Sequence, residues 1–388
     1  MHALTYDGIH AIRHGTVDDP ALLAPTDAIV AVSAAAICGS DLHVYHGREV
    51  GLDAGTVMGH EFVGRVVDVG PGVAGAVRGD TPGPRVGDRV MSPFTTSCGT
   101  CFYCAAGLTA RCTSGQLFGW VEQGRGLHGG QAELVRVPLA ASTLVPIPDD
   151  LGDVEGLLLG DVMATGYHCA RMAEVGPRGT YVVLGCGPVG LMAILAARWF
   201  GAEQLFAVDS VPERLALAAR FGAEPIPLRP VDHGRAATPR AGGSLEPGAQ
   251  ARIGTPEPSA HAAAVVAAIR DATDGRGADA VLEAVGSPSA GRLAYDIVRP
   301  GGTIAVVGVH HTASFAFSPV EAYDKNLTYR VGRCPARAYM PTLVDLARDR
   351  RGDLAALFTH RVPLSDGPAA YALFDEKRDG CVKVMLSM

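Results

Sequence analysis

A glycine-rich turn between a buried strand and a helix is the feature that most constrains the fold of this 388-residue chain. The run GCGPVG, residues 185–190, follows the apolar stretch YVVL and precedes LMAILAARWF. Such a turn lets a helix begin at the carboxyl end of a parallel strand, where backbone amides can approach a phosphate. The segment therefore predicts a dinucleotide-binding βαβ unit.

The residues of this turn have distinct expected roles. Gly185 permits the tight turn, Gly187 leaves room for a pyrophosphate, and Gly190 lets helix and strand pack closely. Pro188 and Val189 complete the segment and begin the helix. We expect all five residues to lie against the bound cofactor.

The next strand favours one nucleotide. It ends at Asp209, where a carboxylate can accept hydrogen bonds from both ribose hydroxyls of NAD and would repel the 2′-phosphate of NADP. Arg214 follows five residues later, and a cation there could tolerate that phosphate. The sequence thus favours NAD and leaves NADP as an alternative.

The alternation of strands and helices divides the chain into two predicted domains. Residues 163–328 alternate in the way of a doubly wound parallel sheet, an α/β Rossmann domain. Residues 1–162 contain mostly short strands and turns, and residues 329–388 return to that pattern, so we expect them to complete one β-rich domain. Residues 229–259 are rich in Pro, Gly, Ala and Arg, which predicts a disordered, flexible insertion.

Four cysteines in fifteen residues predict a metal site. Cys98, Cys101, Cys104 and Cys112 are spaced C-x2-C-x2-C-x7-C within a glycine-containing loop. Zinc is the favoured metal; an iron–sulfur cluster is the alternative, although ferredoxin spacing closes with x3 and Cys-Pro. Disulfides are disfavoured because the nine cysteines are an odd number and no signal peptide precedes them.

Composition excludes several classes of protein. The formal charge of −7 is spread without long runs, so the chain lacks the basic surface that binds nucleic acid. No window reaches 18 uninterrupted apolar residues, which disfavours a membrane protein. With no targeting segment recognised, we expect a cytoplasmic protein.

Upstream, Cys38 in ICGSDLH and His60 in GHEFVGRVVDVGPGV add two further candidate ligands. With these motifs the chain resembles the zinc-dependent medium-chain alcohol dehydrogenases over nearly its whole length. The resemblance implies that the β-rich domain is GroES-like, that Cys38 and His60 bind a catalytic zinc, and that Glu61 lies beside it. The four-cysteine loop would hold a second, structural zinc.

The third ligand of the catalytic zinc departs from the commonest family pattern. Many relatives have a cysteine before the first helix of the cofactor domain, whereas this chain offers Asp161 in LLLGDVMATGYHCA. A carboxylate there balances the charge of the metal and the Cys38 thiolate. We expect Asp161 to be the ligand, with Cys169 as its competitor.

The resemblance also assigns proton transfer and one phosphate contact. Ser40 would pass the alcohol proton through the nicotinamide ribose to His43, which meets solvent. Lys383, in CVKVML, would lie near the cofactor phosphates.

The expected function is zinc-dependent hydride transfer between a primary or secondary alcohol, or an aldehyde hydrate, and NAD. An alternative is a formaldehyde dehydrogenase or dismutase that keeps NAD tightly bound, because the motifs most resemble those of the formaldehyde and polyol dehydrogenase branch. A non-enzymatic binding protein on the same scaffold is the remote alternative. The family leads us to expect a homodimer or homotetramer acting on a small molecule.

Overall fold

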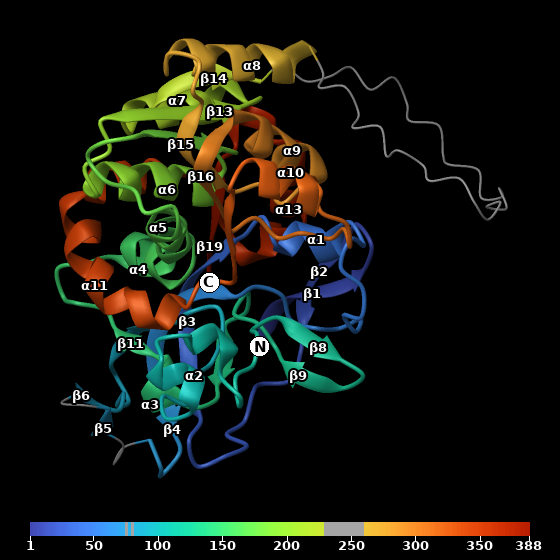
Figure 1. Ribbon diagram of the computed structural model, residues 1–388. Coiled ribbons are helices and arrows are strands. Elements are labelled where there is room, and N and C mark those ends of the chain that lie inside the picture. Colours follow the sequence, from blue (N-terminus) through green and yellow to red (C-terminus); the bar gives the residue numbers. More distant parts are fainter. Residues whose placement is uncertain (74–76, 79–80, 229–259) are drawn as a thin grey trace, which may run out of the picture.

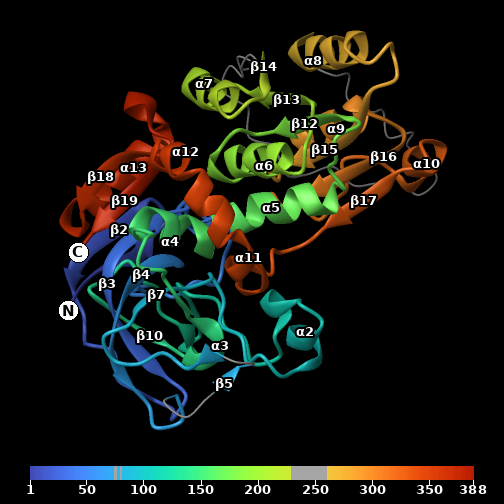
Figure 2. The same ribbon diagram turned by 90° about the vertical axis from the view of Figure 1, so that its left-hand side faces the viewer.

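Two sheets organise the chain, one parallel and one mainly antiparallel (Figure 1). The computed structural model describes residues 1–73, 77–78, 81–228 and 260–388, so the predicted insertion at 229–259 lies outside the described residues. In Figure 1 the parallel sheet occupies the upper lobe, and Figure 2 shows both chain ends in the other lobe.

The lower lobe is built around a seven-stranded sheet in the described residues. Its strands are β3 (Ala28–Ile37), β4 (Glu61–Val69), β7 (Arg89–Met91), β10 (Leu134–Val137), β11 (Val145–Pro146), β18 (Phe358–Pro363) and β19 (Lys383–Ser387). The last strand, β19, pairs antiparallel with β3, so the C-terminal segment completes a sheet begun near the N-terminus. Three hairpins add β1 (His2–Gly8), β2 (Ala11–Thr16), β5 (Val77–Arg78), β6 (Thr81–Pro82), β8 (Trp120–Glu122) and β9 (Arg125–Leu127).

The upper lobe is a six-stranded parallel sheet in the described residues. Its strands are β12 (Thr180–Leu184), β13 (Gln204–Asp209), β14 (Glu224–Pro227), β15 (Ala278–Glu283), β16 (Val298–Val306) and β17 (Thr328–Val331). They lie in the order β14-β13-β12-β15-β16-β17, in which the chain first winds one way from β12 and then the other. This is the doubly wound arrangement that the sequence predicted. The strand β17 straddles the predicted boundary between residues 328 and 329 and pairs with β16, so the parallel sheet extends to Val331.

Helices cover the sheets and join the lobes. The described helices are α1 (Asp41–Tyr45), α2 (Phe102–Ala105), α3 (Ala140–Thr143), α4 (Asp153–Gly160), α5 (Val162–Met172), α6 (Pro188–Trp199), α7 (Pro212–Arg220), α8 (Ala260–Asp271), α9 (Pro288–Ile297), α10 (Pro319–Asp324), α11 (Ala336–Asp349), α12 (Arg351–Ala355) and α13 (Gly367–Glu376). Short 3-10 turns are η1 (Thr109–Arg111), η2 (Leu364–Asp366) and η3 (Arg378–Gly380).

Both faces of the central part of the parallel sheet are covered, which explains why every residue of the central strand β12 is buried. Along β12, Val183 packs into the cluster that contains α5 and α6, whereas Val182 packs into the cluster that contains α8 and α9. Figure 2 shows α5 and α6 on one side of the sheet and α8 on the other. The alternation of a strand's side chains thus fixes this lobe as a three-layer structure.

One core runs through both lobes. The cluster below the parallel sheet continues through α4 and α5 to Val63 of β4 and Met91 of β7 in the other sheet. Because the two sheets share this apolar core, the residues at their junction are held in place from both sides. The candidate functional residues lie at that junction.

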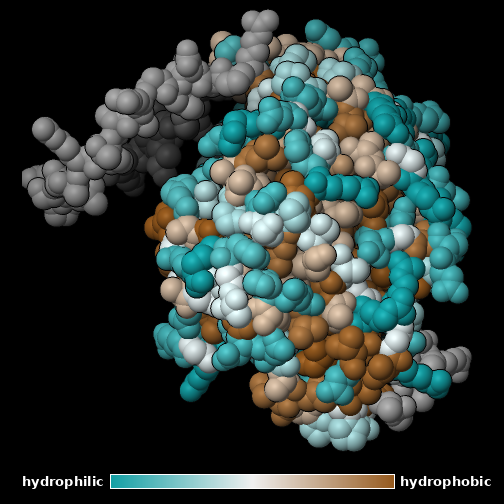
Figure 3. Space-filling view, turned by 180° about the vertical axis from the view of Figure 1, so that it is seen from behind, coloured by the Kyte–Doolittle hydropathy of each residue, from teal (hydrophilic) through white to brown (hydrophobic). Residues whose placement is uncertain are grey.

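The outer surface differs between the lobes on the face opposite to Figure 1. Figure 3 shows apolar side chains gathered at its lower end, on the lobe of the antiparallel sheet. Among the described residues, no helix combines the length and the apolar character needed to cross a membrane.

Candidate metal centre and cofactor cleft

Four side chains distant in sequence converge between the lobes. One ligand atom each from Cys38, His60, Glu61 and Asp161 lies within 4.8 Å of the other three. The Asp161 Oδ2 atom is 3.3 Å from both the Cys38 Sγ and the His60 Nε2. The sequence predicted this set, and the structure brings it together.

Local structure explains how these side chains meet. The antiparallel pairing of β3 with β4 aligns Ala36 with Glu61, so Cys38, just beyond β3, and His60, just before β4, share one sheet edge. Asp161 sits at the break between α4 and α5, with φ −143° and ψ −84°. From this non-helical position the Asp161 carboxylate reaches Cys38 and His60.

The electrostatics of the cluster suit a divalent cation. Burial, with Asp161 and Glu61 nearby, raises the pKa of the Cys38 thiol to about 11. Burial opposes charge on His60, but Asp41 and Asp161 raise the pKa of that imidazole overall. A buried set of sulfur, imidazole and carboxylate donors is costly without a compensating charge and matches the ligands that zinc prefers. The residues present therefore fit zinc.

Asp41 orients the imidazole and was missed by the sequence reasoning. Its Oδ1 lies 3.3 Å from the His60 Nδ1, and its Oδ2 accepts a hydrogen bond from the Cys38 amide at 2.9 Å. Gln131 donates to the same carboxylate at 3.4 Å and accepts from the Tyr371 hydroxyl at 2.8 Å. Such outer partners fix the ring orientation of a metal-binding histidine. Asp41 lies inside the ICGSDLH motif and could have been found, whereas Gln131 and Tyr371 are too distant in sequence.

Lys383 has a different partner from the one predicted. The resemblance placed it near the cofactor phosphates, but its side chain is fully buried and its Nζ lies 2.7 Å from the Glu61 Oε2. Burial disfavours the ammonium, yet the Glu61 carboxylate raises the pKa of Lys383 overall. Glu61 is thereby paired with a cation beside the ligand set. Lys383 also lines the cleft, so its contact with the cofactor phosphates stays a prediction.

The residues assigned to proton transfer lie on the cleft side of the cluster. The Ser40 Oγ is 3.3 Å from the His60 Nε2. The His43 ring contacts the His311 ring, with centroids 4.0 Å apart, so a residue of α1 meets the loop after β16 in the other lobe. Burial, followed by the effects of His311 and Arg48, lowers the pKa of His43 to about 4. His43 is therefore unprotonated at neutral pH.

Cys169, the competitor for the third ligand position, lies elsewhere. Its thiol is buried and donates to the carbonyl of Ala305 at 3.5 Å. Burial raises its pKa, as expected for a packed thiol.

The four-cysteine loop forms the second cluster. The ligand atoms of Cys98, Cys101, Cys104 and Cys112 lie within 4.8 Å of one another. Backbone amides of Cys104 and Thr113 lower the pKa of Cys101 to about 6. The set of four sulfurs fits a tetrahedral zinc and offers no open position for substrate.

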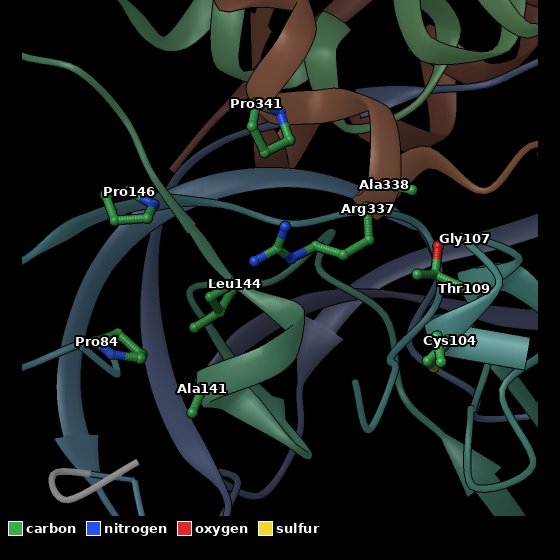
Figure 4. Close-up of a pocket in the computed structure, with 11 residues that line it drawn as sticks. Pro84, Cys104, Gly107, Thr109, Ala141, Leu144, Pro146, Arg337, Ala338 and Pro341 are labelled. Carbon is green, nitrogen blue, oxygen red and sulfur yellow. The ribbon is translucent and has the colours of Figure 1, made fainter. Parts of the chain in front are cut away.

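A cavity of about 380 Å³ lies behind this loop (Figure 4). The Arg337 side chain reaches across it from α11 and donates to the carbonyl of Ser142 at 2.9 Å. Its lining includes Cys104, but none of the residues of the first cluster. We regard it as the packing space between α11 and the cysteine loop.

The predicted cofactor turn lines a cleft of about 870 Å³. Gly185 has φ +84° and Gly187 caps α6, with Pro188 as the first helical residue. A Cβ on Gly190 would lie 1.7 Å from the Gly185 carbonyl oxygen, so only glycine fits there. A Cβ on Gly187 would meet only the Arg214 guanidinium, at 3.8 Å, which leaves open space where a pyrophosphate is expected.

Asp209 and Arg214 flank the same cleft. The Asp209 carboxylate accepts hydrogen bonds from the amides of Cys186 at 2.6 Å and Val211 at 2.8 Å, which fix it at the end of β13. The Arg214 Nε is buried and has no hydrogen-bond partner within the described chain. Both groups remain available to a nucleotide, and the cradle of glycines fits one.

The metal cluster and the cofactor turn share this one cavity. Cys38, His60 and Asp161 line it together with Gly185 and Gly187. A metal-bound substrate and a dinucleotide could therefore meet within it.

Comparison with known proteins agrees with this arrangement. The family model of the alcohol dehydrogenase GroES-like domain matches residues 24–149, and that of the zinc-binding dehydrogenases matches residues 248–349. A medium-chain reductase/dehydrogenase of Acremonium sp is 41% identical over 330 residues, covering 84% of this chain and 98% of that protein. Zinc-type alcohol dehydrogenase B of Aspergillus flavus is 38% identical over 355 residues, covering 90% and 73%.

A solved structure is similar over the whole chain. The alcohol dehydrogenase from Thermus sp. ATN1 superposes with a TM-score of 0.82 at 34% identity, covering 100% of this chain and 99% of that one. The predicted fold class, a GroES-like domain with a Rossmann domain, is confirmed.

Proposed function

The chain belongs to the zinc-dependent medium-chain alcohol dehydrogenase family, and from that premise we propose that it transfers a hydride between an alcohol and NAD. The products would be an aldehyde or ketone and NADH. The observation that carries this proposal is the single cavity shared by the cluster of Cys38, His60 and Asp161 and the glycine turn at residues 185–190.

Two zinc ions per chain are part of the proposal. Cys38, His60 and Asp161 would hold the one that lines the cleft, with Glu61 beside it in its ion pair. Zinc, when bound there, supplies a Lewis acid that polarises the substrate oxygen and favours loss of its proton. The four-cysteine loop would hold the other, which stabilises the fold only.

The proton would leave by way of Ser40 and His43. The Ser40 hydroxyl lies next to the ligand set, so it could accept the alcohol proton while giving up its own toward His43. His43 can receive it because its lowered pKa keeps the imidazole neutral at pH 7. His43 is partly exposed, which gives the proton a route to solvent.

NAD is the proposed cofactor because of Asp209. Its carboxylate is fixed at the strand end, where it would accept hydrogen bonds from the ribose hydroxyls and would repel a 2′-phosphate. The nearby Arg214 is the group that would favour NADP instead.

A panel of alcohols assayed with NAD and with NADP tests the proposal, with nicotinamide reduction as the readout. We expect turnover with NAD. In an Asp209→Ala variant, the ratio of the turnover with NAD to the turnover with NADP should fall. No turnover of any alcohol or aldehyde by zinc-loaded protein would contradict it and favour a non-enzymatic role. Nucleotide released from freshly purified protein, with turnover independent of added NAD, would instead support a dismutase that holds its cofactor.

Pairing of two chains through β17 is the proposed oligomeric contact. The strand is the edge of the described parallel sheet, and the apolar side chains of Val320, Tyr323 and Val331 near it are 68%, 83% and 57% exposed. An unpaired edge with exposed apolar groups favours association with a second copy. Light scattering should give at least a dimer, and Tyr323→Asp should weaken it; a monomeric wild-type protein would contradict this assignment.

A further inference from the structure

Two arginines in the cleft have no role in the chemistry described above. Arg111 ends η1, next to the cysteine loop, and Arg333 follows β17. Both line the cavity that contains Cys38, His60 and Asp161. They come from opposite lobes and border the cleft shared by the metal cluster and the cofactor turn.

The fold brings these two cations close together. The turn η1 packs against α11, which begins three residues after Arg333. Both residues are exposed to solvent at the cleft, and partial desolvation of Arg333, followed by the neighbouring Arg111 guanidinium, lowers the pKa of Arg333. In the described part of the chain, neither guanidinium has a hydrogen bond or an ion pair. Like charges held together in this way are stabilised by an anion from outside.

One acidic group faces the pair without neutralising it. Glu49 also lines the cavity, and its carboxylate raises the pKa of Arg333 against the two lowering effects. Two guanidinium groups against one carboxylate leave a net positive charge at this wall. Phe94, whose ring centroid lies 6.3 Å from that of His60, and Leu117 add apolar side chains to the lining of the same cavity.

We propose that the substrate carries an anionic group, a carboxylate or a phosphate, which Arg111 and Arg333 bind while its hydroxyl reaches the metal cluster. This inference rests on the proposed function and names its substrate class. The planar fork of each guanidinium can donate two parallel hydrogen bonds to either anion. A short carbon chain against Phe94 and Leu117 would connect the anion to the reacting carbon.

Matched substrates test this assignment. A primary alcohol is compared with an ω-hydroxycarboxylate and with a diol monophosphate of the same chain length, and kcat/KM is measured with NAD. We expect the better anion to exceed the neutral alcohol by roughly tenfold or more, as charge-assisted hydrogen bonds would give. The two anionic substrates distinguish carboxylate from phosphate.

Variants locate the effect. Arg333→Gln and Arg111→Gln should each lower the ratio of kcat/KM for the anionic over the neutral substrate by roughly 10- to 100-fold. Glu49→Gln should raise that ratio, because it removes the competing carboxylate. Arg125→Gln, an exposed arginine in β9, is the matched control and should leave the ratio unchanged. A preference for the neutral alcohol that neither arginine variant alters would overturn the inference.

A binding measurement separates this inference from the function on which it rests. Calorimetric titration of the zinc-loaded wild-type protein with the ω-hydroxycarboxylate and the diol monophosphate needs no turnover. Binding that weakens in Arg333→Gln, in a protein with no NAD-linked activity, would support the anion site and contradict the dehydrogenase. NAD-linked turnover of neutral alcohols without anion binding would contradict the anion site alone.

Discussion

The two candidate metal clusters differ in how the chain builds them. Cys98, Cys101, Cys104 and Cys112 come from one loop, and three of the four are partly exposed. Cys38, His60 and Asp161 come from three separate segments, lie between the lobes, and border a cleft of about 870 Å³. One cluster ties a loop together, whereas the other depends on the fold of the whole molecule.

This difference teaches where reactivity is located. The cysteine loop offers four donors, which saturate a tetrahedral ion. The inter-lobe cluster offers three donors facing the cleft and a fourth group, the Glu61 carboxylate, which is paired with Lys383. A metal ion with an open position next to a cofactor can act on substrate, so the less conspicuous cluster is the one we expect to react.

The largest expected effect comes from Asp161→Ala. It removes one of three ligands in the cleft, so turnover should fall by at least about 10³-fold, and elemental analysis should show one zinc lost and one retained. Asp366→Ala, an exposed aspartate, is the control. Full zinc content with a near-normal rate would refute the ligand assignment and remove the contrast between the clusters.

Cys104→Ser tests the four-cysteine cluster and should lower stability. Loss of a structural zinc costs about 5 kcal/mol or more, so the midpoint of thermal unfolding should fall by at least about 10 °C. Cys381→Ser, a buried cysteine outside both clusters, measures the cost of the substitution itself. If correctly folded Cys104→Ser protein had no turnover, this would contradict the proposal that the four-cysteine cluster stabilises the fold while the inter-lobe cluster acts on substrate.

Lys383→Met tests whether the ion pair beside the inter-lobe cluster stabilises the fold. It leaves the buried Glu61 carboxylate unpaired, which should lower the free energy of unfolding by about 3–5 kcal/mol in denaturant titration. The double variant with Glu61→Gln should recover most of that loss. Equal free energies of unfolding for Lys383→Met and wild-type protein would show that the ion pair between Lys383 and Glu61 does not stabilise the fold.

The smallest effect is a pH dependence from His43. Its pKa is about 4 in the folded chain against an ordinary value of 6.5, so the unfolded state binds more protons between these values. Stability should therefore decline as the pH falls from 6.5 to 4. In His43→Gln the decline in unfolding midpoint over that range should be shallower than in wild type; parallel curves would contradict the assigned pKa.

Prediction from sequence succeeded where the signal was local. The glycine turn at residues 185–190 and the four-cysteine spacing each specify their own geometry within a short segment. Asp161 was predicted through family resemblance, and the structure explains it by the break between α4 and α5. The ion pair of Lys383 was not predicted, because nothing in CVKVML shows that β19 pairs with β3 and buries the amine against Glu61; its contact with the cofactor phosphates stays a prediction.

The sequence alone determined the order of the elements, the glycine turn and the four-cysteine donor set, because backbone preferences and ligand spacing act over a few residues. The set of Cys38, His60 and Asp161 was predicted through family resemblance. Only the tertiary structure decided which side chains share a space. The contact of His43 with His311 and the approach of Arg111 to Arg333 both join the two lobes. The burial and the pKa of a site residue depend on neighbours that are distant in sequence. The packed core that links both sheets determines which residues those neighbours are.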